Sequence, residues 1–370
     1  MVDVKWWNAG AYYGVVLSEG LARRGHRVWV AGLPRSPVIR EAQKRGLRTI
    51  SLPFHNPLLG WEVIQGLRRL LCTEGIQLVN AHRSEGHFYS AISLRTLRRC
   101  IPLVRTIGDV RYPNTHPLNR WLHHRMTDGF IVSARRTKRV YHERLGLPLD
   151  RIRVVYAGLD IEKFREGIRP GRLRAELNLD PEVPLIGVIA RLSPEKGHVY
   201  FLQAAAHVVR RVPAVHFLIS GEEVQIRIAE LQAVADRLGI LQRVHWIDRR
   251  ADVRDLISDV NIGVIPSLRS EVICRIAMEF MALGKPIVGT AVNVIPEMIE
   301  HGRTGLIVPP GDPEAMARAM VTLLREPEWA RQLGENGRRH TKARFNLDQM
   351  VEQTENMYAQ LLDTTSGKKG

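Results

Sequence analysis

Apolar runs alternate with amphipathic stretches through the first 160 residues of the chain. Runs rich in Val, Ile and aromatic residues predict β-strands at 2–7, 27–32, 47–52, 102–107, 129–133 and 152–156, and one more that ends at Ala81 and His82. Helical spacing of apolar positions predicts helices at 15–25, near 37–45 and at about 61–73. Gly25 is suited to end the first of these helices.

A second series of the same kind begins at residue 184. Strands are predicted at 184–190, 215–220, 243–247, 261–265, 286–290 and 305–308, with helices between them and from about 312 to 362. Residues 157–182 contain Gly, Pro and charged residues without a long apolar run, and we expect them to form the inter-domain connection.

This alternation predicts an α/β protein with doubly wound parallel sheets. A length of 370 residues suits two domains. We expect an N-terminal domain at 1–165, a C-terminal domain at 166–345, and at 346–370 a helix that packs back on the N-terminal domain, followed by a polar tail. Two such domains place ligands in a cleft at the carboxyl ends of their strands.

The charge of the chain is uneven. There are 54 Lys and Arg against 38 Asp and Glu, a formal net charge of +16. Residues 1–165 contain 28 basic and 12 acidic side chains, whereas the remainder contains 26 of each. This asymmetry indicates an acidic partner for the first half, namely a phosphorylated glycan, an anionic lipid or nucleic acid. A solvated, Arg-rich surface is the alternative.

Cysteine usage and hydropathy predict a cytoplasmic location. Cys72, Cys100 and Cys274 match no zinc spacing, and three cysteines do not suggest a disulfide framework. No apolar run reaches about 18 residues, and the first ten residues lack a signal-peptide pattern. Any membrane association is therefore expected to be peripheral.

Two glutamates lie eight positions apart in a predicted strand–loop–helix segment. Glu271 is expected in the loop or at the helix start, and Glu279 about two turns along the helix. The backbone N–H groups of Val272, Ile273 and Cys274 are expected at the helix start, where they form an anion site. Glu279 suits the two hydroxyls of a ribose. On spacing alone, two ordinary helix glutamates remain the alternative.

Two cations follow the predicted strand at 184–190. Arg191 and Lys196 lie five positions apart at the carboxyl end of that strand, where they can clamp a diphosphate. The alternative is a solvated turn with a surface pair between Glu195 and Lys196.

These motifs together resemble the family 4 glycosyltransferases. The resemblance is carried by VVYAGLDIEKF (154–164), GVIARLSPEKG (187–197), PSLRSEVICRIAMEFMALGKPIVGT (266–290) and IPEMIEHGRTGLIVPPGDPEAMA (295–317). It covers nearly the whole chain and is strongest from about 150 to 345. It implies the GT-B fold, with two Rossmann-like domains and a cleft between them, and retaining transfer from a nucleotide sugar.

The resemblance also implies roles for particular residues. Arg191 and Lys196 would hold the donor diphosphate, Glu271 would face the donor sugar, and these three form the expected catalytic group. The other donor-binding residues would be Glu279, Gly221 and the segment Val272, Ile273 and Cys274. The acceptor side of the cleft would be lined by Gly10 and Ala11 in a loop after the first strand, by His82, and by Asp109 and Arg111. The chain departs from the family pattern at Val272, where glycine is common, and at residues 8–11, where paired glycines are usual.

The expected chemistry needs no metal or other cofactor. Transfer expels a diphosphate while the sugar becomes oxocarbenium-like, and cations with a helix N-terminus stabilise that leaving group. No two aspartates lie two positions apart, so no metal-binding DxD motif is present. The histidines of the first half show no metal-ligand spacing with carboxylates.

The sequence therefore predicts a retaining glycosyltransferase of cell-surface polysaccharide or lipopolysaccharide-type synthesis. We expect an NDP-sugar donor, UDP favoured, and a glycan or lipid-linked acceptor. An anionic membrane surface is a further candidate partner, and nucleic acid is disfavoured. The alternatives are another GT-B nucleotide-sugar enzyme, such as an epimerase or hydrolase, and a non-catalytic basic scaffold that binds membrane or nucleic acid.

Overall fold

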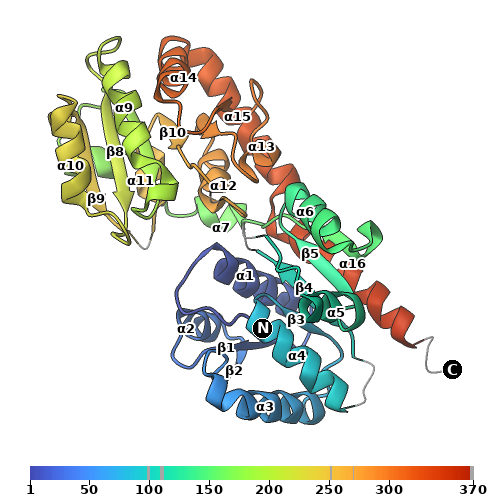
Figure 1. Cartoon of the computed structure of the whole chain (residues 1–370). Helices are drawn as coiled ribbons and strands as arrows, with labels where there is room; N and C mark the ends of the chain where they lie inside the picture. Colours follow the sequence, from blue (N-terminus) through green and yellow to red (C-terminus); the bar gives the residue numbers. More distant parts are fainter. Residues whose placement is uncertain (98–100, 109–111, 251, 270, 367–370) are drawn as a thin grey trace. The chain divides into compact units, whose positions relative to one another are not determined.

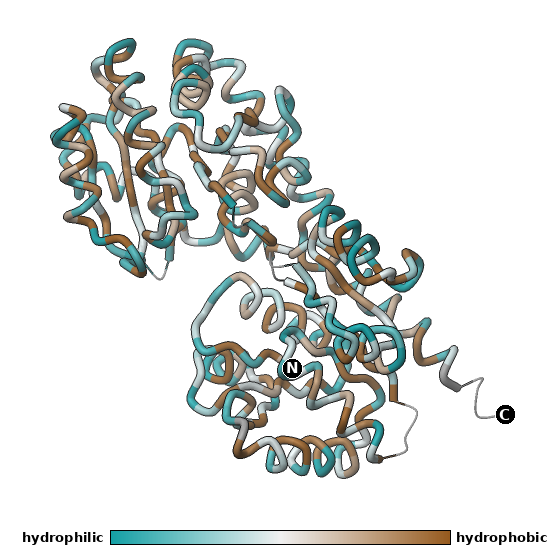
Figure 2. Tube along the Cα trace, viewed as in Figure 1, coloured by the Kyte–Doolittle hydropathy of each residue, from teal (hydrophilic) through white to brown (hydrophobic). Residues whose placement is uncertain are grey.

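The computed structural model describes residues 1–97, 101–108, 112–250, 252–269 and 271–366 (Figure 1). The chain divides into two compact units: unit 1 is Met1–Gly158 with Leu347–Gly370, and unit 2 is Leu159–Asn346. The division after Gly158 lies earlier than the expected boundary at residue 165. In both units the strands are largely hydrophobic in colour (Figure 2), as expected for sheets covered by helices.

Unit 2 is built on one six-stranded parallel sheet. Its order is β12-β11-β10-β7-β8-β9, formed by β7 Leu185–Ile189, β8 His216–Gly221, β9 Val244–Asp248, β10 Ile262–Ile265, β11 Ile287–Thr290 and β12 Leu306–Val308. Every strand coincides with a predicted apolar run. In the register of the central pair, Gly187 of β7 lies opposite Gly263 of β10. The chain order reverses between β7 and β10, which is the topological switch point where such sheets bind ligands.

The helices of unit 2 flank this sheet. They are α7 Ile161–Arg165, α8 Arg172–Glu176, α9 His198–Val209, α10 Ile228–Arg237, α11 Arg254–Asp259, α12 Arg275–Ala282, α13 Ile295–Met298, α14 Pro313–Arg325 and α15 Pro327–Arg344. The core beneath α9 and α14 is mainly aliphatic, with Phe201 and Phe217 in edge-to-face contact at 5.8 Å. Phe280 of α12 packs on Gly263 of β10, where a Cβ atom would clash with its ring. This contact fixes α12 against the switch point.

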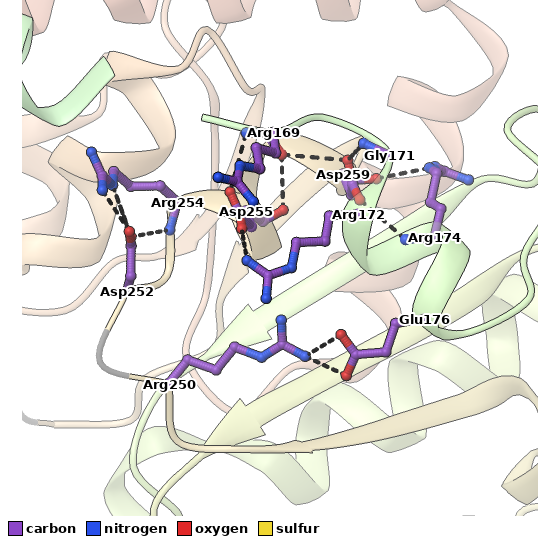
Figure 3. A network of polar contacts seen from close by, with 11 residues as sticks. Arg169, Gly171, Arg172, Arg174, Glu176, Arg250, Asp252, Arg254, Asp255 and Asp259 are labelled. Carbon is purple, nitrogen blue, oxygen red and sulfur yellow. Dashed lines mark hydrogen bonds and ion pairs between the residues drawn. The ribbon is translucent and has the colours of Figure 1, made fainter. Parts of the chain in front are cut away.

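Most of the expected inter-domain connection belongs to unit 2 and is anchored there by an Arg–Asp network (Figure 3). Asp259 accepts hydrogen bonds from the backbone N–H groups of Gly171 and Arg174. The buried Arg174 side chain donates to the carbonyl oxygens of Asp259, Asp180 and Val183 and to Asn261 Oδ1. Residues 171–183 are therefore attached next to the start of the central strand β10, because this guanidinium satisfies several backbone carbonyls at once.

Unit 1 contains a four-stranded and a two-stranded parallel sheet. The larger has the order β3 Val79–Ala81, β4 Leu103–Ile107, β5 Gly129–Val132 and β6 Ile152–Val154, and the smaller pairs β1 Trp29–Gly32 with β2 Arg48–Ser51.

The predicted strand at residues 2–7 was wrong. Val2 donates its N–H to Ala31 O and His82 donates its N–H to Met1 O, so the segment touches both β1 and β3, but no regular strand forms. The chain bends at Lys5 and Trp6, so only its first residues run beside β1 and β3, with Val2 and Val4 buried.

Seven helices complete the described part of unit 1. They are α1 Ala9–Arg23, α2 Pro37–Lys44, α3 Gly60–Thr73, α4 Ser84–Leu97, α5 Pro117–Arg125, α6 Arg135–Leu145 and α16 Leu347–Ser366. Helix α16 is attached to this unit through Val351 against Gly20, Met357 against Gly129, and a 2.6 Å hydrogen bond from Asn80 Nδ2 to Tyr358 Oη. Among the described residues, no helix is long and apolar enough to cross a bilayer.

Candidate functional site

The candidate site lies in unit 2, where loops leave β7 and β10 at the switch point. The β7 loop contains Arg191 and the short 3₁₀ turn Pro194–Lys196, and the β10 loop runs from Pro266 to Cys274. Gly197 has φ +72° and faces Pro266 O so closely that a Cβ atom would clash with it. Leu268 donates its N–H to Glu195 O at 2.8 Å. The two loops are therefore held against each other by backbone contacts.

Lys196 and Glu271 form an ion pair across these loops. Lys196 Nζ contacts Glu271 Oε1, and Ser267 Oγ donates a 2.6 Å hydrogen bond to the same oxygen. Only 16 % of the Lys196 side chain and 8 % of the Glu271 side chain are exposed. Thr290 Oγ1 donates to Ser267 O at 2.6 Å, which supports the serine from β11. A pair this well buried is costly unless both charges are satisfied, and here each has a partner.

Gly221 joins a third loop to this arrangement. It ends β8, and a Cβ atom there would clash with Ala190 O, directly after β7. Backbone hydrogen bonds from Ala190 N–H to Ser220 O and from Leu192 N–H to Glu222 O hold the loop after β8 against the loop after β7. Arg191 is more exposed and forms an ion pair with Glu195 at 2.7 Å. The structure thus brings Lys196 and Glu271 together and places Arg191 at the rim of the same loop.

Val272, Ile273 and Cys274 were wrongly expected at the helix start, and their role as an anion site remains a prediction. Helix α12 begins at Arg275, so these three amides precede the helix. Cys274 has φ +44° and redirects the chain into α12, where Ala277 already donates its N–H to Cys274 O. Burial raises the pKa of the Cys274 thiol well above its usual range, and the Glu271 carboxylate adds to the effect. The thiol therefore stays protonated.

Glu279 has a different partner from Glu271. It lies on α12, where it is buried and forms a 2.6 Å ion pair with Arg275 one turn earlier. Burial raises the pKa of the Glu279 carboxyl, and Arg275 opposes that shift. Its assignment to ribose hydroxyls remains a prediction.

Comparison with known proteins identifies the chain. The model of Glycosyltransferase Family 4 matches residues 11–163, and the model of Glycosyl transferases group 1 matches residues 183–326. The chain belongs to these glycosyltransferases. Each of its two units contains one of the matched domains, except for residues 159–163, which the first model includes.

Relatives support the same family. The glycosyltransferase is 28 % identical to an alpha-D-kanosaminyltransferase of Streptomyces kanamyceticus, over 93 % of this chain and 98 % of that protein. It is 28 % identical to a D-inositol 3-phosphate glycosyltransferase of Xylanimonas cellulosilytica, over 94 % and 90 %. The structure of Anabaena HepE in complex with UDP matches with a TM-score of 0.85 at 20 % identity, over 97 % and 98 %. The predicted GT-B fold, with two Rossmann-like sheets, is therefore confirmed.

The residues expected on the acceptor side lie in unit 1 of the glycosyltransferase. Gly10 and Ala11 were wrongly expected in a loop, since they form the first turn of α1, where Asn8 Oδ1 accepts the Ala11 N–H at 2.9 Å. His82 directly follows β3, with its ring 5.9 Å from that of Tyr13, and burial keeps its pKa well below the usual value. Asp109 and Arg111 lie outside the described residues.

Ser267 and Thr290 are the supporting residues that sequence reasoning did not assign to the site. They fall inside the segment 266–290 that carries the family resemblance, but only the order of β10 and β11 in the sheet shows that Thr290 reaches Ser267. Within the described ranges, no group of three or more His, Cys, Asp or Glu residues is placed to hold a metal ion.

Proposed function

We propose that the chain is a retaining, metal-independent glycosyltransferase that uses a UDP-sugar. Its acceptor is a phosphate-bearing glycan or a lipid-linked glycan of cell-surface polysaccharide or lipopolysaccharide-type synthesis. The observation that carries this proposal is the Lys196–Glu271–Ser267 group at the switch point of unit 2. It combines a cation for a leaving diphosphate with a carboxylate fixed one loop away.

The proposed step breaks the bond between the anomeric carbon and the diphosphate and forms a bond from that carbon to an acceptor hydroxyl oxygen. The hydroxyl attacks on the face from which the diphosphate departs, and its proton passes to the leaving phosphate. Lys196 stabilises the charge that develops on the diphosphate, with Arg191 at the loop rim as the second cation. Glu271 faces the donor sugar, and no residue acts as a covalent nucleophile.

The ion pair makes a specific test possible. Lys196 is engaged by Glu271, so a diphosphate has to share that ammonium with the carboxylate. We expect Glu271→Gln to bind UDP about as tightly as, or tighter than, the parent, while transfer falls about 100-fold because the contact to the donor sugar is lost. Isothermal calorimetry and initial rates separate the two effects. Glu230→Gln is the control, because Glu230 is exposed on α10 and a glutamine oxygen can still accept the N–H of Arg227. Loss of UDP binding together with transfer would contradict the proposal.

Donor identity can be tested by ligand-linked stabilisation. The Anabaena relative was solved with UDP, and we extend that base to this chain as a proposal. A ligand at 100 times its dissociation constant stabilises the folded state by about 2.7 kcal/mol. We expect a larger melting-temperature shift with UDP-sugars than with GDP-, ADP- or CMP-sugars. Nuclear magnetic resonance of the product should show the anomeric configuration of the donor, whereas the inverted anomer would refute retention.

The acceptor proposal is supported by charge. Unit 1 contains 28 basic and 14 acidic side chains, and one relative is named for D-inositol 3-phosphate. We therefore expect KM to be lower for a phosphorylated acceptor than for its dephosphorylated form, with the difference shrinking as salt is added. Equal KM values would remove the phosphate from the proposal. The proposed location is the cytoplasm, with peripheral attachment to the inner face of the membrane.

A further inference from the structure

Helices α4 and α5 of unit 1 present large apolar side chains to solvent. Phe88 on α4 is 40 % exposed, and Leu118 and Trp121 on α5 are 55 % and 45 % exposed. The three residues line one cavity of about 250 Å³, together with Ile92 and the arginine Arg95. These side chains form a continuous apolar patch between the two helices.

The spacing along each helix shows that this patch has a charged border. Phe88, Ile92 and Arg95 are four and seven positions apart on α4, so they share one helix face. Leu118, Trp121 and Arg125 share one face of α5 in the same way. Each helix therefore carries an apolar stripe that ends in an exposed arginine. Leu122, one turn after Leu118, is buried in the wall of the same cavity, and the buried His123 lies on the opposite side of α5.

The two helices that carry the patch lie on the same side of the four-stranded sheet of unit 1. Strands β3 to β6 are consecutive and parallel, so right-handed crossovers place α4, α5 and α6 on one side of the sheet. Helix α5 is tied to α6 by hydrogen bonds from Arg120 Nη2 to Arg144 O and between His124 Nε2 and Leu145 O. Helix α16 contacts the same sheet through Met357 on Gly129 of β5.

Helices α5 and α6 also carry a strong excess of positive charge. The two helices contain one acidic residue, Glu143, and their basic residues are Arg120, Arg125, Arg135, Arg136, Lys138, Arg139 and Arg144. An apolar patch bordered by cations matches the chemistry of an anionic bilayer, in which phosphates lie above hydrocarbon. Nucleic acid would use the cations but would leave Leu118 and Trp121 without a partner.

We propose that the outer face of α4 and α5, with the basic helix α6 beside it, docks on an anionic lipid bilayer. Trp121 enters the headgroup boundary, where an aromatic ring with one polar edge is favoured, and Phe88 and Leu118 insert their apolar side chains beside it. Arg95 and Arg125 lay their aliphatic stems along the apolar patch and direct their guanidinium groups to lipid phosphates. This docking is independent of the donor site, since every residue involved lies in unit 1.

Vesicle co-sedimentation of the full chain tests the proposal. We expect the chain to bind vesicles of phosphatidylcholine mixed with phosphatidylglycerol. Its affinity for vesicles of phosphatidylcholine alone should be lower by about tenfold or more. Arg95→Gln with Arg125→Gln should weaken binding to the anionic vesicles about 30-fold, from about 1 kcal/mol per cation. The matched control is Arg210→Gln with Arg211→Gln, two exposed arginines of unit 2, which removes the same charge and should leave binding unchanged.

The apolar half of the patch needs its own variants. Leu118→Ser with Trp121→Ser should weaken binding about tenfold or more, because insertion of these side chains is lost. Trp121→Phe should bind like the parent but lose the blue shift of tryptophan fluorescence on vesicles. UDP-induced stabilisation should be unchanged in every variant, which shows that unit 2 is folded and separates this proposal from the proposed function.

Three outcomes would overturn the docking proposal. Equal binding to neutral and anionic vesicles would exclude recognition of lipid charge. Equal losses in the patch variants and in the unit 2 control would show a non-specific charge effect. Retained vesicle binding in the Leu118 and Trp121 double variant, with DNA binding lost in the Arg95 and Arg125 double variant, would assign the face to nucleic acid instead.

Discussion

The two units use their charged residues in opposite ways. Unit 2 contains 26 basic and 24 acidic side chains, and charges near its site are held in fixed pairs, such as Lys196 with Glu271 and Arg275 with Glu279. Unit 1 contains 28 basic and 14 acidic side chains, so no arrangement can give each cation its own carboxylate within that unit. The charges of unit 2 are thus nearly balanced within the unit, whereas unit 1 has a surplus of positive charge, which we propose serves an external partner.

The strongest test of this comparison replaces one internal cation of unit 2. Lys196→Met removes the ammonium that we propose to stabilise the leaving diphosphate, and we expect kcat/KM to fall about 1,000-fold. Lys342→Met is the control, since that lysine of the same unit is exposed and its contact with Glu162 is a surface pair. Initial transfer rates measure both. A rate for Lys196→Met close to that of the control would show that the buried pair is structural only.

The sequence was sufficient for the sheet of unit 2 but not for its site geometry. All six strands could be predicted because each is a short apolar run bordered by Gly, Pro or charged residues, as in 286–290. The pair between Lys196 and Glu271 joins positions 75 apart and exists because β10 lies beside β7, which periodicity does not reveal.

The errors of prediction have local causes. In unit 1, the capping residue Asn8 was a readable signal that α1 begins at Ala9, yet the apolar run at 2–7 suggested a longer strand. In unit 2, the left-handed backbone at Cys274 delays α12 to Arg275, and a left-handed cysteine is not encoded by any propensity.

A second test separates the two loops of unit 2 that follow β7 and β10. Gly197→Ala forces a left-handed alanine and drives its Cβ into Pro266 O, so we expect a loss of about 3 kcal/mol. Gly239→Ala is the control, because Gly239 also has positive φ, +68°, but nothing lies within 4 Å of its Cβ position. That variant should lose about 1 kcal/mol.

Native-state hydrogen exchange measures these losses unit by unit, since two units need not unfold together. The expected signature is faster exchange in β7 and β10 of Gly197→Ala, with unit 1 unchanged. Equal destabilisation of the two glycine variants would show that the loops do not depend on contact with Pro266.

Acid should destabilise unit 1 more than unit 2, the reverse of the glycine test. Burial lowers the pKa of His123 to about 4, and burial holds the pKa of His87 beside it well below the usual value. An unfolded histidine binds a proton below about pH 6.5, whereas native His123 stays neutral down to about pH 4. The free energy of unfolding therefore falls as the pH drops from about 6.5 to about 4. At pH 5 His123 alone accounts for a loss of about 2 kcal/mol in unit 1.

Urea unfolding of the full chain at pH 7 and pH 5, followed by hydrogen exchange in β5, measures this loss. His123→Phe is the informative variant, because His123 stacks on Phe130 with ring centroids 5.6 Å apart and a phenyl ring keeps that contact without titrating. It should flatten the pH dependence of unit 1. In the described part of unit 2, burial lowers the pKa of His198 to about 4 and also lowers the pKa values of His216, His245 and His340. In unit 1 burial holds the pKa of His82, like that of His87, well below its usual value, so unit 2 should respond less than unit 1. A larger loss of stability in unit 2 than in unit 1 between pH 7 and pH 5 would contradict this prediction.

The smallest effect is expected where unit 1 does form a surface ion pair. Glu355 of α16 accepts hydrogen bonds from His26 at 2.6 Å and Arg24 at 2.8 Å at the end of α1, and these contacts lower the pKa of its carboxyl. Glu355→Gln should cost only about 0.5 kcal/mol, and the loss should vanish at high salt, because the pair is partly solvated. Helix α16 should stay protected from proteolysis, since Val351 on Gly20 and Met357 on Gly129 hold it by apolar packing. Release of α16 in this variant would mean that unit 1, like unit 2, depends on fixed charge pairs.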